Sequence, residues 1–239
     1  MHPGLFMHTP EDAWFAGSTT YWSRQDASVD GMLGGLGSLH DADVRDSVAF
    51  IGRFLPLITA GEAPKATVAL DVGAGIGRVS ENVLLRFTGR VAILEADERF
   101  VAQARERLGD RLVHAYAMRM QQLPDKPQPS EPCPYDFVWV QWVLMYASDA
   151  EVVRLLRALH ARLADKAKGY IGVKENVKSS TGADAIDVDS SDCSIVRTPE
   201  HFRRVFAAAG MRVVAEAVQT GFPRHLYSVH MFMLQAVPQ

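Results

Sequence analysis

The chain has few of the features that mark secreted, membrane-spanning or fibrous proteins. It contains two cysteines, Cys133 and Cys193, among 239 residues, too few for a disulfide-rich scaffold and typical of a reducing compartment. No stretch reaches the roughly 18 uninterrupted apolar residues that a membrane span needs. The first eight residues, MHPGLFMH, lack the cationic region and apolar run of a signal peptide. These absences predict an intracellular protein without a membrane partner, and they leave cytoplasm and nucleus both open.

An excess of charge of either sign is also missing. The 25 basic and 28 acidic side chains leave a formal net charge of -3, which supplies no general field for nucleic acid. No basic stripe with interleaved aromatic residues is present either. The eight histidines show no metal-ligand spacing, and the two cysteines form no zinc motif. We therefore expect no metal and no nucleic-acid partner, and any charged partner must be recognised by a local patch.

Strand-like and helix-like segments alternate from about Thr67 onward, and no repeat interrupts them. This alternation is typical of an α/β fold. We expect a mostly parallel seven-stranded sheet with an antiparallel C-terminal hairpin. The predicted strands are 67–72, 91–94, a short one near 113, 135–143, 170–173, 211–218 and 226–234, and the predicted helices are 76–87, 97–108, 149–163 and 198–210.

The chain divides into two parts by composition. Residues 1–60 are expected to form an N-terminal helical extension, and residues 61–239 the core. The extension contains a glycine-rich piece at 29–37, for which a linker and a lid over the site are both open. A polar insertion at 179–192 is expected to be a long loop, and long loops in compact domains are disproportionately functional.

A glycine motif follows the first predicted strand. Asp71 precedes Gly73, Gly75 and Gly77 in the spacing Gly-x-Gly-x-Gly, which lets the backbone turn sharply and approach a ligand closely. It stands at the strand-to-helix turn where an open α/β sheet places its ligand crevice. The dinucleotide fingerprint is incomplete, because Arg78 occupies its last position.

An acidic residue completes this set. Glu95 ends the second predicted strand, about 20 residues beyond the glycines, where a carboxylate can accept hydrogen bonds from ribose hydroxyls. The combination favours an S-adenosylmethionine site. A nicotinamide or flavin site and a turn without a ligand are the alternatives.

Six segments together are similar to one known family. They are YW at 21–22, VDGMLGG at 29–35, LDVGAGIGR at 70–78, VWVQWV at 138–143, KEN at 174–176 and DVDSS at 187–191. In this order and spacing they resemble the protein α-N-terminal methyltransferases. The resemblance implies a Rossmann-like class I methyltransferase with S-adenosylmethionine as cofactor and S-adenosylhomocysteine as product. It also implies monomers acting on protein N-termini with proline second and lysine or arginine third.

The resemblance assigns roles to individual residues. The cofactor contacts that it implies, together with the glycine motif, are Trp22, Asp71, Gly73, Gly75, Gly77, Arg78, Glu95, Met120, Gln121 and Gln141. The implied substrate contacts are Tyr21, Leu33, Leu39, Trp142, Asp187, Ser191 and Tyr227. Asn176 is expected to hold the first substrate residue, Asp189 to act as the base, and Tyr146 to assist by hydrogen bonding.

Two positions depart from the family pattern. Tyr146 stands where the family often carries a histidine, which argues against a mechanism with two bases. Ile186 stands where the family often has the first of two paired acids, which removes one acidic contact for a basic third residue. On the bare sequence, a core role is the alternative for Trp142, although the adjacent polar Gln141 favours a function, and for Asp189 a solvated acidic loop is the favoured interpretation. With the resemblance, we expect Asp189 to be partly buried.

Methylation of an α-amino group requires only a weak base. An α-amino group with a pKa of about 7.7–8.0 costs about 1–1.4 kcal/mol to deprotonate near pH 7, whereas a lysine side chain costs nearer 4.6 kcal/mol. A carboxylate such as Asp189 is therefore adequate for an N-terminus. A small-molecule methyltransferase and a non-catalytic S-adenosylmethionine-binding protein are the competing hypotheses.

Overall fold

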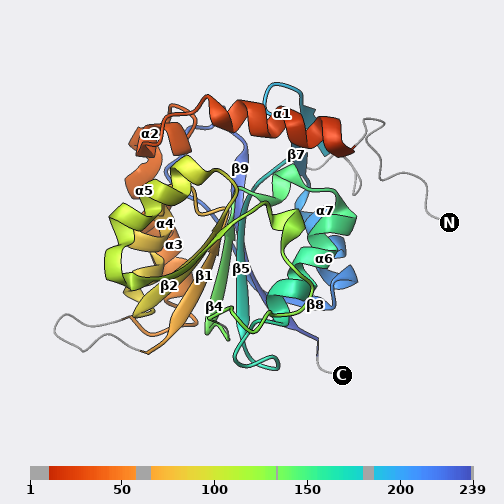
Figure 1. The fold of residues 1–239 in the computed structure, drawn as a ribbon. Helices are drawn as coiled ribbons and strands as arrows, with labels where there is room; N and C mark the ends of the chain where they lie inside the picture. Colours follow the sequence, from red (N-terminus) through yellow and green to blue (C-terminus); the bar gives the residue numbers. More distant parts are fainter. Residues whose placement is uncertain (1–10, 58–65, 133, 180–185, 238–239) are drawn as a thin grey trace.

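A computed structural model describes residues 11–57, 66–132, 134–179 and 186–237. Its centre is a twisted sheet with helices on both faces (Figure 1). The predicted boundary between residues 60 and 61, and Cys133, lie outside the described residues.

The described residues form one sheet of nine strands, seven of which correspond to the seven predicted from the sequence. Five of them are parallel, in the order β3-β2-β1-β4-β5, and β9 then pairs antiparallel with β5 and β8 antiparallel with β9. Their bounds are Leu112–Ala117, Arg90–Glu95, Val68–Val72, Phe137–Gln141 and Tyr170–Val177 for the parallel strands, Met211–Val218 for β8 and Ser228–Ala236 for β9. The predicted parallel sheet with an antiparallel C-terminal hairpin is confirmed.

The two faces of the sheet have separate cores. Helices α3 (His40–Ile51), α4 (Arg78–Asn82) and α5 (Glu98–Leu108) cover one face, and α6 (Asp149–His160) and α7 (Pro199–Ala208) cover the other (Figure 1). Side chains alternate between the faces along each strand, so Trp139 joins the first core and Val140 the second. Because both faces are covered, the central strands are apolar throughout.

The predicted helix at 76–87 is shorter than expected. It begins at Arg78, ends at Asn82, and is followed by a separate 3-10 turn at Leu84–Arg86. Val83 between them adopts φ -120° and ψ -63°, outside the helical range. Val83 is nevertheless fully buried, so the apolar pattern correctly located the core face.

The second half of the polar insertion is a hairpin, which corrects the expectation of a loop. Strands β6 (Ile186–Asp189) and β7 (Ser194–Arg197) pair antiparallel, and β7 meets β5 at the pair Val177 and Arg197. β6 is exposed along most of its length, so it shows no apolar run that could reveal a strand. Cross-strand pairing stabilises it, and single-strand propensity does not report that pairing.

The N-terminal extension lies over the carboxyl ends of the strands. Helix α1 (Glu11–Ser23) crosses above the sheet (Figure 1), followed by α2 (Val29–Met32) and a 3-10 turn at Gly37–Leu39 that leads into α3. Arg99 of α5 donates a hydrogen bond of 3.0 Å to the carbonyl of Trp22. The extension is therefore fastened to the core beside the first strand-to-helix turns.

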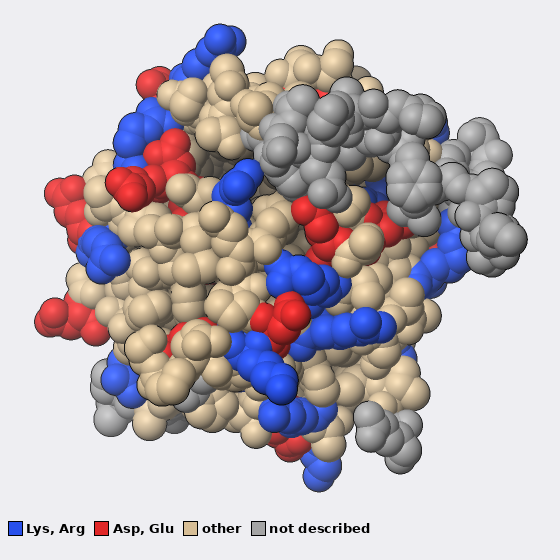
Figure 2. All heavy atoms as spheres, turned by 45° about the vertical axis from the view of Figure 1, so that its right-hand side comes forward, with Lys and Arg blue, Asp and Glu red and all other residues tan. Residues whose placement is uncertain are grey.

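Charge is unevenly distributed over the surface. Figure 2 shows Lys and Arg side chains gathered over the face that carries α6 and α7. Several of these charges are paired, as in Arg154 with Asp125 and Arg203 with Glu216. Within the described ranges, no helix is long and apolar enough to span a bilayer.

Candidate active site

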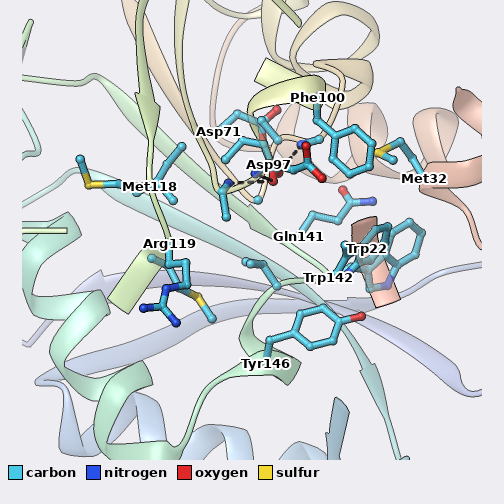
Figure 3. Close-up of a pocket in the computed structure, with 18 of the residues that line it drawn as sticks. Trp22, Met32, Asp71, Asp97, Phe100, Met118, Arg119, Gln141, Trp142 and Tyr146 are labelled. Carbon is cyan, nitrogen blue, oxygen red and sulfur yellow. Dashed lines mark hydrogen bonds between the residues drawn. The ribbon is translucent and has the colours of Figure 1, made fainter. Parts of the chain in front are cut away.

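A pocket of about 640 Å³ opens at the carboxyl ends of β1, β2 and β4. Here the strand order reverses on either side of β1 and β4, which is where open α/β sheets bind ligands. The pocket size suits a ligand of the dimensions of a nucleoside cofactor. Its walls come from the β1–α4 turn, the ends of β2 and β4, residues 118–121, and α1 and α2 of the extension (Figure 3).

The glycine turn forms the floor of this pocket. Gly73, Gly75 and Gly77 have φ angles of 75°, 54° and 76°, a backbone region that favours glycine. A Cβ at Gly73 would lie 2.6 Å from the Cβ of Val143, and one at Gly75 would lie 2.5 Å from the Sδ of Met32. Gly73 and Gly75 line the pocket, whereas Gly77 does not and instead precedes helix α4.

The acidic end of the pocket contains Glu95 and Asp97. One Glu95 carboxylate oxygen accepts from the amide of Gly75 at 2.8 Å, and the other accepts from the amides of Ala96 and Asp97 at 2.7 and 2.9 Å. Burial raises the pKa of Glu95. Asp97 lines the same end (Figure 3) and was missed from the sequence, where its position before helix α5 indicates a helix cap.

A buried charge cluster supports the opposite wall. The Arg78 guanidinium lies 2.6 Å from one oxygen of Asp43, and the Lys174 ammonium lies 2.5 Å from the other. Gln141 donates to both oxygens, at 3.0 and 3.2 Å. Burial disfavours the Asp43 anion, but Lys174 and Arg78 together hold the pKa of Asp43 below its ordinary value. Asp43 was not predicted, because nothing in the sequence around it marks it.

This cluster fits a cofactor that carries a carboxylate. Two buried cations face one buried carboxylate, so the three side chains sum to one positive charge. An uncompensated buried charge is costly, and an anionic ligand group beside Arg78 would balance it. Arg78 and Gln141 both line the pocket, as predicted for cofactor contacts.

Aromatic side chains form the other end of the pocket. Trp22, Trp142 and Tyr146 converge there (Figure 3), and the rings of Trp22 and Tyr146 meet edge to face at 6.2 Å. Trp142 has φ 51°, a conformation that non-glycine residues adopt rarely and often at functional sites. Its indole Nε1 is buried and has no hydrogen-bond partner among the described residues. These rings offer a cation–π surface to a cationic ligand.

Glu175 clamps the turn that holds Trp142. One of its carboxylate oxygens accepts from the amides of Val143 and Leu144 at 2.9 and 2.7 Å. The side chain is fully buried, and burial raises its pKa to about 8. The sequence motif contains Glu175, but its role was not predicted.

The predicted cofactor residues are largely brought together by the fold. Nine of the ten line the pocket, namely Trp22, Asp71, Gly73, Gly75, Arg78, Glu95, Met120, Gln121 and Gln141. Of the predicted catalytic and substrate residues, Tyr146 and Trp142 line it. The others, Tyr21, Leu33, Leu39, Asn176, Asp187, Asp189, Ser191 and Tyr227, lie outside its lining.

Asp189 is exposed, which corrects the expectation of partial burial. One of its oxygens accepts from both the hydroxyl and the amide of Ser191, at 2.6 and 2.8 Å, and these bonds lower the pKa of Asp189. The predicted partial burial failed because β6 is an edge strand whose side chains face solvent.

Asp187 has partners of its own. It forms an ion pair with Lys178, and Tyr227 donates a hydrogen bond of 3.3 Å to it. Asp187 and Tyr227, both predicted to contact substrate, therefore lie side by side on neighbouring parts of the surface. Lys178 compensates part of the negative charge of Asp187.

The fold and the pocket define a class I S-adenosylmethionine-dependent methyltransferase: a parallel sheet ending in an antiparallel pair, a Gly-x-Gly-x-Gly turn after β1 and an acid at the end of β2. Over residues 10–235 the sequence matches the family described as AdoMet dependent proline di-methyltransferase, and the chain belongs to this family.

Similar proteins agree with this assignment. The N-terminal Xaa-Pro-Lys N-methyltransferase 1 of Rattus norvegicus is 34% identical over 231 residues, which cover 94% of this chain and 96% of that protein. The alpha N-terminal protein methyltransferase 1 of Arabidopsis thaliana is 32% identical over 95% of this chain and 81% of its own length. A solved SAM-dependent methyltransferase of Leishmania major has a TM-score of 0.80 at 31% identity, covering 98% of this chain and 87% of that one.

Proposed function

We propose that the chain methylates the α-amino group of protein N-termini that begin Xaa-Pro-Lys or Xaa-Pro-Arg, and that it acts as a monomer. The observation that carries this proposal is the layout of the pocket, in which an aromatic end lies next to the acidic hairpin β6–β7. The names of the rat and Arabidopsis relatives support the same substrate class. A small-molecule enzyme would be expected to have a closed apolar pocket without such a hairpin.

The cofactor supplies an activated methyl group on a sulfonium, and the work of the protein is to position a neutral amine against it. Trp22 and Trp142 provide rings that attract a cationic substrate before it loses its proton. In this proposal Asn176 holds the first substrate residue and Asp189 provides a nearby carboxylate. Because its lowered pKa makes Asp189 a weak base, an α-amine suits this site better than a lysine side chain.

Acidic residues of the hairpin are proposed to select a basic third residue. Asp187 and Asp189 are both in β6, two residues apart, so their side chains lie on the same face of the strand. Since Lys178 pairs with Asp187, most of the uncompensated negative charge on this face belongs to Asp189. The selectivity for lysine or arginine over a neutral third residue is therefore expected to be modest.

Isotope-labelled S-adenosylmethionine with a Ser-Pro-Lys peptide tests the proposal. We expect label on the peptide and none on its N-acetylated copy, with mass spectrometry placing the methyl groups on the α-nitrogen. A Ser-Pro-Gln peptide measures the contribution of the third residue. Methylation of the acetylated copy would show that a side chain is the acceptor and would exclude the N-terminal assignment.

A further inference from the structure

The hydroxyl of Tyr146 links the pocket to the hairpin β6–β7. Tyr146 lines the aromatic end of the pocket, and its hydroxyl donates a hydrogen bond of 3.3 Å to one carboxylate oxygen of Asp192. Asp192 lies in the turn between β6 and β7 and is half-buried. Of the hairpin carboxylates that the structure describes, Asp192 is the one that is hydrogen-bonded to a side chain of the pocket lining.

The turn holds Asp192 in a defined orientation. Its second oxygen accepts from the amide of Ser194 at 3.0 Å. The next residue, Cys193, has φ 59° and lies against α1, since a Cβ at Gly17 would be 2.3 Å from its Sγ. One oxygen of Asp192 is therefore used by the turn, and the other is directed to Tyr146.

The hydroxyl of Tyr146 retains capacity for one more partner. A tyrosine hydroxyl has one proton to donate and two lone pairs that accept. The proton goes to Asp192, and the ring of Trp22 packs edge to face against that of Tyr146. Burial first, and then the charge of Asp192, holds the pKa of Tyr146 well above its ordinary value. The hydroxyl therefore stays protonated, and its oxygen can accept a hydrogen bond at the aromatic end of the pocket.

We propose that Asp192 is a positioning residue for methyl transfer, acting through Tyr146, whose hydroxyl oxygen accepts a hydrogen bond from an N–H of the substrate amine. This proposal rests on the proposed function. The hydrogen bond turns the nitrogen lone pair away from Tyr146. As the carbon–nitrogen bond forms and the carbon–sulfur bond breaks, positive charge moves from sulfur to nitrogen. The Asp192 carboxylate stabilises that charge through the polarised hydroxyl, and this interaction is stronger in the transition state than in the bound substrate.

Other charged groups face this pair from several elements. Tyr21 of α1 and Asp189 of β6 lie on the hairpin side, and the charges of Asp192 and Asp189 both raise the pKa of Tyr21. Beneath Tyr146, Arg197 of β7 donates to the carbonyls of Leu144 and Ala147, and it pairs with Asp149, which also contacts His201. Glu175 of β5 binds the amide of Leu144. Of these groups, Arg197 and Glu175 contact the backbone around Tyr146, whereas Asp192 contacts its hydroxyl.

The test compares pH profiles of kcat for the unaltered chain, Asp192→Asn and Tyr146→Phe with a Ser-Pro-Lys peptide. Asparagine keeps an oxygen for the Ser194 amide, so the turn is preserved. We expect the kcat plateau at high pH to fall about 10-fold in each variant. A carboxylate favours the charged form of a nearby amine, so the midpoint of the Asp192→Asn profile should move to lower pH by about 0.5–1 unit. The double variant should lose no more than the worse single variant.

The controls separate this proposal from the proposed function. Asp110→Asn, at an exposed position after α5, should match the unaltered chain in plateau and midpoint. Asp189→Asn shows whether the effect belongs to Asp192 rather than to hairpin charge in general, because an equal midpoint shift there would overturn our assignment. An Asp192→Asn plateau and midpoint equal to those of the unaltered chain would also overturn it. Absence of α-amine methylation by the unaltered chain would overturn the proposed function, and this proposal with it.

Discussion

Glu175 shows how a single buried side chain sets the geometry of the site. Its carboxyl group binds two amides of the turn after Trp142 and so helps to hold that residue at a positive φ. A carboxyl group with a pKa near 8 is largely protonated at neutral pH. The clamp therefore works chiefly as a neutral acceptor, and the charge that glutamate brings is a cost of folding at high pH.

The raised pKa of Glu175 predicts how the stability of the folded chain depends on pH. The pKa of Glu175 in the folded chain, about 8, exceeds its ordinary value of 4.5. Between pH 4.5 and pH 8, this carboxyl group is therefore protonated to a greater extent in the folded chain than in the unfolded chain. The free energy of unfolding must then fall as pH rises through this window. Glu175→Gln should match the unaltered chain at pH 5 and be more stable by about 1–3 kcal/mol at pH 8.

Urea unfolding at pH 5, 6, 7 and 8 measures this difference. Glu106→Gln, at an exposed position of α5, is the matched control and should leave the pH dependence unchanged. A Glu175→Gln variant that loses stability equally at every pH would show that the carboxyl group is needed in its charged form.

At the scale of elements, helix α1 and the hairpin β6–β7 support each other. Gly17 of α1 lies directly against Cys193, which follows Asp192 in the turn. The same helix places Ser18 and Trp22 in the pocket wall. A displacement of α1 would therefore affect both the cofactor pocket and the hairpin turn.

Substitution at the contact tests this coupling. Gly17→Val would place branched carbon atoms where the sulfur of Cys193 lies, and overpacking of this kind costs about 1–3 kcal/mol. We expect lower peptide turnover and weaker S-adenosylhomocysteine binding, both measured directly. Ala16→Val, at the exposed neighbouring position, carries only the helix-propensity cost of a β-branched residue. Equal effects of the two substitutions would show that the contact with Cys193 does not matter.

The elements differ in how well sequence reveals them. Most strands and helices from β1 to α7 could be predicted from their buried apolar patterns, and the glycine turn could be predicted from its spacing. The pair β6–β7 did not, because an exposed edge hairpin is fixed by cross-strand partners. The same limit applies within the site: Gly73 and Glu95 follow a known spacing, whereas Asp43 and Asp192 reach Arg78 and Tyr146 only through tertiary structure.

In the whole molecule, the cofactor pocket joins the extension to the core. Ser18, Thr19, Trp22 and Met32 come from the extension, and the remaining lining residues come from the strands, helices and loops of the core. A ligand in this pocket contacts both parts at once. Because it binds the folded chain alone, it must raise the free energy of unfolding.

Thermal unfolding measures this gain. S-adenosylhomocysteine at 100 times its Kd should add about 2.7 kcal/mol, which corresponds to a rise in Tm of roughly 5–10 °C for a chain of this size. Arg78→Met should reduce the shift, because it removes the predicted partner of the ligand carboxylate. Methylthioadenosine, which lacks that carboxylate, should give the same shift with both proteins at the same ligand concentration. A shift by S-adenosylhomocysteine that survives Arg78→Met would contradict the predicted role of Arg78.

The attachment of β6–β7 has an evolutionary consequence. The hairpin meets the sheet at the pair Val177 and Arg197, while the glycine turn and the acids of the cofactor pocket belong to β1 and β2. Under the proposed function, substrate choice can therefore diversify largely in a separate stretch of the gene from the cofactor motifs. Exchange of residues 186–193 between relatives would then change peptide preference, and it would also replace the contacts that Asp192 and Cys193 make with Tyr146 and Gly17 beside the cofactor pocket.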